Sequence, residues 1–111
     1  MSKISTVIIT FNSEKFIKSC LDSIFTQDYR DFEVIVVDNG SKDGTVDFIK
    51  ENYPQVTLIE NKENLGTCKV RNQGIEIAKG EWILTLDCDV TLEKNFISQI
   101  LEAIKHLSPK A

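Results

Sequence analysis

The amino-acid sequence predicts an α/β protein: a three-layer sandwich in which helices cover both faces of a mostly parallel, four-stranded sheet. Strand and helix patterns alternate four times along the 111 residues, which is typical of parallel sheets with crossover helices. The strand patterns are short and almost continuously apolar, as in strands buried on both faces. Polar side chains directly follow three of these strands, at positions 10–12, 38–40 and 87–89.

The first strand and helix are predicted within residues 4–25. Residues 4–10 are mostly β-branched, which favours a strand. Asn12 or Ser13 is expected to cap the helix that follows. Apolar side chains then recur at helical spacing between positions 16 and 25, and Cys20, which lies among them, is expected in the core.

The second strand is predicted over residues 33–38 and ends in the carboxylate of Asp38. Residues 39–45 contain Asn-Gly and Asp-Gly pairs, which are hairpin signals between alternating strands. Here a helical pattern follows over positions 46–53, so we interpret the segment as a strand-to-helix loop. Pro54 is expected to end that helix.

The third strand and helix are predicted over residues 56–59 and from about Thr67 to Lys79. Gly80 is suitably placed to cap the carboxyl end of the helix. Gly74, inside the helix, costs about 1 kcal/mol against alanine. Close packing against the sheet or a ligand would explain its presence.

The fourth strand, residues 82–86, is predicted to be buried on both faces and is followed by Asp87 and Asp89. In an extended chain these two carboxylates project to the same side. At roughly 6 Å apart they repel by about 3 kcal/mol at an effective dielectric near 20, and a bound divalent cation would relieve this repulsion. The alternative is a helix cap beside a solvated aspartate. Thr91 is expected to cap the last helix, whose apolar face runs from Phe96 to Ile104.

The composition fits a single domain over residues 1–111. The apolar fraction is 41%, the charged fraction 27% and the net charge −4, and no basic tract favours nucleic-acid binding. The three cysteines form no CxxC pair, which is typical of a reducing compartment. No segment approaches the ~20 apolar residues of a membrane span. We therefore expect a cytoplasmic protein.

The polar clusters at the strand ends suggest a binding site, because ligands of wound α/β sheets lie beyond the carboxyl ends of the strands. Asp38 could accept a hydrogen bond from a base or ribose, or it could only cap its loop. Arg71 has a planar fork that suits phosphate or a heterocycle carbonyl, or it could be a surface ion-pair residue. Asp87 and Asp89 could hold Mg²⁺ or Mn²⁺, which in turn could hold a diphosphate. The sequence contains no GxGxxG, P-loop or GxSxG motif.

Several motifs, taken together, resemble the amino-terminal, nucleotide-binding half of family 2 glycosyltransferases, which have a Rossmann-like A-type glycosyltransferase fold. The matching stretches are residues 5–12 (STVIITFN), 37–45 (VDNGSKDGT), 64–66 (NLG), 71–74 (RNQG), 78–82 (AKGEW) and 87–89 (DCD). They occur in the family's order and span nearly the whole chain. Asn39 stands where the family often has aspartate, and Lys69 where it often has a small residue.

The resemblance implies a nucleotide-diphosphate sugar as donor, with a UDP-sugar expected. Thr10 and Phe11 would frame the base, Asp38 and Arg71 would contact the nucleoside, and Asp87 would approach the ribose. Asp89 would ligate Mn²⁺ or Mg²⁺. The expected donor-binding residues are Thr10, Phe11, Asn12, Asp38, Asn39, Arg71 and Asp87, and the expected metal ligands are Asp89 and Asp87.

The resemblance further implies transfer with inversion to an acceptor hydroxyl. The family's catalytic base and most of its acceptor site lie well downstream of the position of Asp89, so no residue here is named as the base. The first hypothesis is therefore a donor-binding domain that is incomplete for catalysis alone. The second is a non-catalytic interaction module that keeps the fold, with self-association through surface left open by the missing half.

Overall fold

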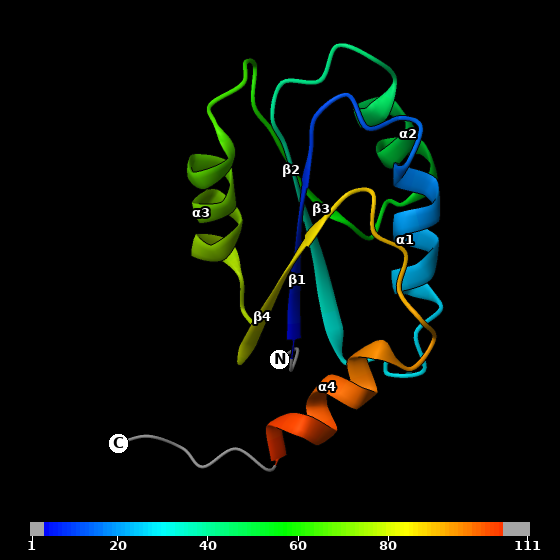
Figure 1. The fold of residues 1–111 in the computed structure, drawn as a ribbon. Coiled ribbons are helices and arrows are strands. Elements are labelled where there is room, and N and C mark those ends of the chain that lie inside the picture. Colours follow the sequence, from blue (N-terminus) through cyan, green and yellow to red (C-terminus); the bar gives the residue numbers. More distant parts are fainter. Residues whose placement is uncertain (1–3, 106–111) are drawn as a thin grey trace.

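The computed structural model describes residues 4–105 as strands and helices that alternate in the predicted order (Figure 1). The elements are β1 (Ile4–Thr10), α1 (Ile17–Phe25), β2 (Phe32–Asp38), α2 (Thr45–Asn52), β3 (Thr57–Glu60), α3 (Thr67–Ile77), β4 (Trp82–Asp87) and α4 (Phe96–Lys105). The strands form one sheet in the order β3-β2-β1-β4, and every pairing is parallel. None of the helices in this described part is both long and apolar enough to cross a bilayer.

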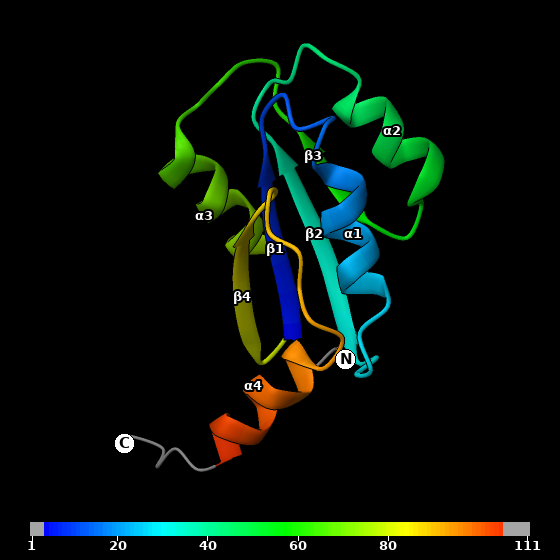
Figure 2. The ribbon, with the colours of Figure 1, turned by 45° about the vertical axis from the view of Figure 1, so that its right-hand side comes forward.

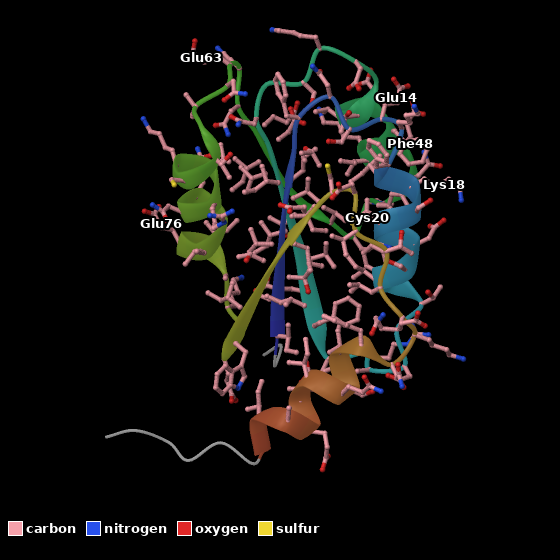
Figure 3. All side chains as sticks on the ribbon, viewed as in Figure 1. Glu14, Lys18, Cys20, Phe48, Glu63 and Glu76 are labelled. Atoms are coloured by element: carbon pink, nitrogen blue, oxygen red, sulfur yellow. The ribbon has the colours of Figure 1, made fainter. Side chains whose placement is uncertain are left out.

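Helices cover both faces of the sheet, which confirms the predicted three-layer sandwich. Helix α3 lies on one face, and α1 and α2 lie on the other (Figures 1 and 2). Side chains fill the space between each helical layer and the sheet (Figure 3). Because successive strand residues point to opposite faces, Val7 of β1 packs toward α3 with Val70, and Ile8 packs toward α1 with Leu21.

The register of the sheet brings three strand ends to one edge. Thr10 at the end of β1 pairs with Asp38 of β2, and Ile9 pairs with Asp87 of β4. The sheet runs from β1 through β2 to β3 in one direction, whereas β4 lies on the other side of β1. The winding direction therefore switches between β1 and β4, where such folds form their ligand sites.

Strand β4 is not buried on both faces, so that prediction was wrong. Within residues 4–105, β1 is its only strand partner, and Trp82 and Ile83 remain 43% and 41% exposed. An apolar run predicts a strand, but it does not tell which neighbours cover it. The strand also ends at Asp87, where a turn begins with the Val90 amide donating to the Asp87 carbonyl over 3.2 Å. Asp89 therefore lies in a turn and not, as assumed, in an extended chain.

The two predicted amino-terminal helix caps were also wrong. Neither Asn12 nor Ser13 caps α1 with its side chain, because a turn precedes the helix. In this turn the Ser13 carbonyl accepts from the amides of Phe16 and Ile17, each over 2.9 Å. Similarly, Thr91 lies five residues before α4 begins at Phe96.

The amino end of α4 is held by Gln27, a buried side chain from the segment after α1. Its Oε1 accepts the Ile97 amide over 2.9 Å, and its Nε2 donates to the carbonyl of Glu93 over 2.5 Å. Gln27 is 1% exposed. A long-range contact thus replaces the local cap that the sequence suggested.

Two glycines of the chain mark close approaches to β1. A Cβ on Gly74 would lie 2.5 Å from Val7 Cγ1, so α3 packs closely on the sheet, one of the two explanations foreseen for this glycine. Gly80 does not cap α3, which ends at Ile77 and continues through an extended Ala78. Instead, the Gly80 amide donates to Ser5 Oγ over 2.7 Å, and a Cβ there would meet the Ser5 amide nitrogen at 2.6 Å.

Candidate functional site

The end of β1 and the loop that follows it carry three predicted site residues. Thr10 is fully buried, whereas Phe11 is 46% exposed. Asn12 has a positive φ of 48°, a conformation that asparagine tolerates better than most residues. Its amide donates to Ser41 Oγ and its Oδ1 accepts the Lys42 amide, each over 2.8 Å. The β1 loop is thereby tied to the β2 loop.

Asp38, at the end of β2, is 1% exposed and accepts four hydrogen bonds from within the chain. Its Oδ1 accepts from Thr10 Oγ1 over 2.7 Å and from Ser41 Oγ over 2.6 Å. Its Oδ2 accepts the amides of Gly40 and Ser41 over 3.2 and 2.8 Å. An ionised carboxylate has about four acceptor sites, so these contacts match the loop-capping alternative. A contact between Asp38 and a nucleoside stays a prediction.

Asn39 connects three segments around the site. Its amide donates to the Thr10 carbonyl over 2.8 Å. Its side-chain Nδ2 donates to Asn64 Oδ1 over 3.1 Å, and its Oδ1 accepts the Leu65 amide over 2.7 Å. These bonds bring the segment before α3 to the ends of β1 and β2.

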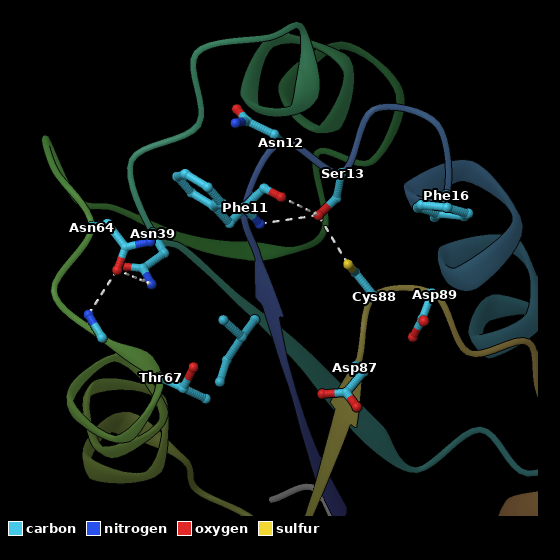
Figure 4. Close-up of a pocket in the computed structure, with 12 residues that line it drawn as sticks. Phe11, Asn12, Ser13, Phe16, Asn39, Asn64, Thr67, Asp87, Cys88 and Asp89 are labelled. Carbon is cyan, nitrogen blue, oxygen red and sulfur yellow. Dashed lines mark hydrogen bonds between the residues drawn. The ribbon is translucent and has the colours of Figure 1, made fainter.

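A pocket of about 440 Å³ opens where these loops meet β4. Figure 4 shows side chains from the ends of β1, β2 and β4 around it. Five of the predicted site residues line it: Phe11, Asn12, Asn39, Asp87 and Asp89. The sheet register thus brings together residues that are up to 78 positions apart in the sequence (Phe11 and Asp89).

A second, smaller cavity of about 180 Å³ places Arg71 beside Asp87. Ile9, Thr85 and Leu86 complete its lining. Asp87 lines both cavities, so the site of Arg71 adjoins the main pocket. The Nε of Arg71 is buried and has no hydrogen-bond partner among residues 4–105, which leaves a donor available at this place.

The predicted residues Thr10 and Asp38 line neither cavity and lie beneath the loops that do. The main pocket also has lining residues that sequence reasoning did not predict: Ile9, Ser13, Phe16, Asn64, Gly66, Thr67 and Cys88. Asn64 and Gly66 belong to one of the motif stretches quoted above, so the motif was a usable signal for them. The sequence pattern around Ser13 and Phe16 indicates only the start of a helix.

Cys88 lies between the two carboxylates but points away from them. Figure 4 shows its side chain directed at Ser13, whereas Asp87 and Asp89 extend in the other direction. The distance between Cys88 Sγ and Ser13 Oγ is 2.9 Å. Ser13 Oγ also accepts the Phe11 amide over 3.0 Å, so this contact joins the turn after β4 to the loop after β1.

The two carboxylates suit a hard divalent cation that takes its remaining ligands from elsewhere. Both Asp87 and Asp89 are exposed and line the pocket. Within residues 4–105, no three histidine, cysteine or acidic side chains gather closely enough to hold a metal alone. Mg²⁺ and Mn²⁺ commonly complete their shell with water and substrate phosphates. The donor set therefore fits such a cation together with an anionic ligand.

Comparison with known sequences gives a consistent family assignment. Residues 5–110 match the family described as "Glycosyl transferase family 2". Glycosyltransferase GlyG of Streptococcus pneumoniae is 32% identical over 107 residues, which cover 92% of this chain and 35% of the relative. The poly(ribitol-phosphate) beta-glucosyltransferase of Bacillus spizizenii is 44% identical over 93 residues, which cover 78% of this chain and 15% of the relative.

Solved structures share the fold. Residues 1–349 of TarS from S. aureus, in complex with UDP, superpose with a TM-score of 0.85 at 31% identity, covering 93% of this chain and 32% of that one. The mannosyltransferase PcManGT from Pyrobaculum calidifontis, in complex with GDP-Man and Mn²⁺, gives a TM-score of 0.80 at 30% identity, covering 96% of this chain and 32% of that one. The chain thus spans about a third or less of the length of the proteins that it matches.

Proposed function

The chain belongs to glycosyl transferase family 2 and has its A-type glycosyltransferase fold, and we propose that it binds the nucleotide-diphosphate sugar donor of a glycosyl transfer reaction. The observation that carries the proposal is the pocket between β1 and β4, with Asp87 and Asp89 on one side and the loops after β1 and β2 on the other. Similar structures contain UDP, UDP-GlcNAc or GDP-Man, which supports a ligand of this class.

We assign the nucleoside to the part of the pocket next to the β1 and β2 loops. Phe11 offers an exposed aromatic face to a base, and Asn12 and Asn39 lie beside it. Thr10 supports this loop from below through Asp38. Arg71 would reach the ligand from the adjoining cavity, where its unpartnered Nε can donate. A UDP-sugar is the donor that we propose.

We assign the diphosphate to a Mn²⁺ or Mg²⁺ ion held by Asp89 and Asp87. Two exposed carboxylates alone would repel a diphosphate. A divalent cation bound to the carboxylates would instead attract the diphosphate. The Mn²⁺ in the structure of PcManGT supports a cation in this fold. When bound, such an ion would stabilise the charge that develops on the leaving diphosphate.

Transfer itself is proposed to need residues beyond these 111. By analogy with the family, an acceptor hydroxyl would attack the donor sugar with inversion after losing its proton to a carboxylate, a role that we assign to no residue among these 111. We therefore propose that the chain forms one donor-binding domain and does not transfer sugar alone. The acceptor and the sugar are left open.

Isothermal titration of the chain with UDP, with and without Mn²⁺, tests the proposal. Asp89→Ala should weaken Mn²⁺-dependent binding by at least about tenfold, because a charge-assisted contact contributes roughly 1.5–3 kcal/mol. Asp47→Ala, at an aspartate on α2 that is also exposed, is the matched control and should bind as the unchanged chain does. Circular dichroism establishes that each sample is folded. Absence of Mn²⁺-dependent binding in a folded, unchanged chain would reject the proposal.

A second candidate function is that of an interaction module, and the exposed edge strand β4 favours it. Trp82 and Ile83 are more than 40% exposed on an edge strand, and such strands pair readily with other chains. Self-association would then occur through this edge, and light scattering would detect it. Asp89→Ala should leave that association intact. The three free cysteines support a cytoplasmic location, which cell fractionation can check.

A further inference from the structure

We propose that Ser23 of α1 is a positioning residue for the cation site: it holds the segment that carries Asp89 against α1. This segment, residues 88–95, runs from the end of β4 back along α1 to α4, and we call it the return segment (Figures 1 and 2). Ser23 lines neither of the two cavities described above. The role rests on the proposed function, in which Asp89 ligates the cation.

The side chain of Asp89 does not fix its own position. It is exposed, and within residues 4–105 its carboxylate accepts no hydrogen bond. The turn that contains it is closed by the Val90 amide, which donates to the Asp87 carbonyl over 3.2 Å. That bond joins the turn to the end of β4 but to no element beyond it. The place of the Asp89 carboxylate therefore depends on where the backbone of the return segment is held.

Two serine hydroxyls attach the return segment, one on each side of Asp89. Before it, Cys88 Sγ lies 2.9 Å from Ser13 Oγ. After it, the Leu92 amide donates to Ser23 Oγ over 3.0 Å. Both serines belong to α1 or to the turn before it. Only three residues lie between positions 88 and 92, so attachment at both ends leaves Asp89 little room to shift.

The hydroxyl of Ser23 is oriented for this contact by its own helix. Ser23 is 8% exposed, and its Oγ donates to the carbonyl of Cys20 over 2.7 Å. A hydroxyl has one proton and two acceptor lone pairs. Because the proton is used on Cys20, the lone pairs remain for the amide of Leu92. The side chain of Leu92 packs against the core cluster that contains Cys20, so the bond and the packing hold the same residue.

Other contacts hold the far end of the return segment. The Asp28 amide donates to the Lys94 carbonyl over 2.9 Å, and Gln27 Nε2 donates to the Glu93 carbonyl over 2.5 Å. These two bonds lie farther along the chain from Asp89 than Leu92 does, and they lead into α4. Removal of the Ser23 hydroxyl should therefore loosen the part of the segment near Asp89 while α4 stays attached.

The experiment uses two serine-to-alanine variants of the 111-residue chain. Ser23→Ala removes the hydroxyl without a change of charge. Ser98→Ala is the matched control, because the Ser98 hydroxyl also donates to a carbonyl three residues earlier, that of Asn95, over 3.0 Å. Within residues 4–105, however, the Ser98 hydroxyl accepts no amide. Amide hydrogen exchange at Leu92, followed by NMR, reports the attachment without any ligand, and calorimetric titration with UDP, with and without Mn²⁺, reports the cation site.

We expect the Leu92 amide to exchange faster in Ser23→Ala but not in Ser98→Ala. The gain in UDP affinity that Mn²⁺ provides should fall about threefold to tenfold in Ser23→Ala alone. One hydrogen bond has about this effect, and apparent affinity falls with the population of the form that can bind. Affinity for UDP without Mn²⁺ should not change, since Ser23 lines neither cavity.

A double-variant cycle separates positioning of Asp89 from a general loss of structure. In Asp89→Ala the carboxylate that Ser23 is proposed to position is gone. Adding Ser23→Ala to this variant should therefore lower the affinity for UDP in the presence of Mn²⁺ no further. A further fall by the same factor as in the unchanged background would overturn the role.

The remaining outcomes are also distinct. Unchanged Leu92 exchange, or an unchanged Mn²⁺ gain, in a folded Ser23→Ala variant rejects this role alone. If Ser23→Ala does not fold, Ser23→Cys takes its place: sulfur is only a weak acceptor, so both changes should appear to a smaller extent, and their absence would overturn the role. If the unchanged chain shows no Mn²⁺-dependent binding of UDP, the proposed function itself fails, and the role at the cation site fails with it.

Discussion

The Thr10 hydroxyl donates to Asp38 Oδ1 over 2.7 Å, between two residues that are register partners across β1 and β2. Both side chains are buried. The same Asp38 oxygen accepts from Ser41 Oγ, and Ser41 Oγ accepts the Asn12 amide. One hydroxyl beneath the surface therefore supports the loops that line the pocket, although Thr10 does not line it.

Replacing Thr10 with valine should lower the free energy of unfolding by about 1–3 kcal/mol, because a buried carboxylate loses a donor. Thr6→Val is the matched control, since Thr6 is also fully buried on β1 but its hydroxyl has no hydrogen-bond partner within residues 4–105. That change should be neutral or stabilising. Urea denaturation measures both, and an equal loss in the two variants would contradict the role given to Thr10.

Gly74→Ala should destabilise the chain by roughly 1–3 kcal/mol through overpacking. Its Cβ would lie 2.5 Å from Val7 Cγ1 and 3.2 Å from Val37 Cγ2. At an unobstructed helix position the same change would stabilise by up to about 1 kcal/mol, so the sign of the effect is informative. The double variant Gly74→Ala/Val7→Ala should lose less stability than the sum of the losses of the two single variants. Additive losses in thermal denaturation would show that the two positions do not interfere.

Gln27→Leu should destabilise the attachment of α4. The Ile97 amide and the Glu93 carbonyl would both lose their partner. The loss should be about 1–3 kcal/mol for the buried Ile97 amide, and smaller for the carbonyl of Glu93, which is an exposed residue. Gln99→Leu makes the same change on the exposed side of α4 and should have little effect. Chemical denaturation compares the two variants, and equal midpoints would argue against a role for Gln27 in holding α4.

Burial raises the pKa of the Cys20 thiol from 9.0 to about 12, and the nearby Cys88 and Asp89 add to the shift. Between these values the unfolded chain loses the thiol proton while the folded chain keeps it. The free energy of unfolding should therefore fall as pH rises above about 9, up to about 12. Cys20→Ala should reduce this slope, measured by urea denaturation across that range.

A second group with a raised pKa must be separated from Cys20 in that measurement. The pKa of Tyr53 is also raised, mainly by burial and by its hydrogen bond to Asp22, so only the difference between Cys20→Ala and the unchanged chain isolates Cys20.

Cys68 is exposed, and it should react with iodoacetamide at pH 8 well before Cys20 does. Peptide mapping by mass spectrometry checks the order, and similar rates would contradict the buried placement of Cys20.

The sequence predicted the order of the elements and the meeting of three polar strand ends at one edge, because both follow from local pattern and from the geometry of parallel sheets. It was wrong about the burial of β4, whose apolar run is the same whether or not a neighbour covers it. It was also wrong about the amino-terminal caps of α1 and α4 and about Gly80 as the carboxyl-terminal cap of α3. Gln27, which binds the Ile97 amide, lies 70 residues before it, a separation at which no local cap rule applies.

For the site, residue types and motif spacing determined which side chains to consider, and five of them line the pocket. Only the tertiary structure separated these from Thr10 and Asp38, which lie underneath and hold the loops. Only it showed that Asn39 meets Asn64 across 25 positions of sequence. The physical reason is that a hydrogen bond depends on where its two partners lie in space. The sequence specifies the donors and acceptors, and the packed sheet decides which of them meet.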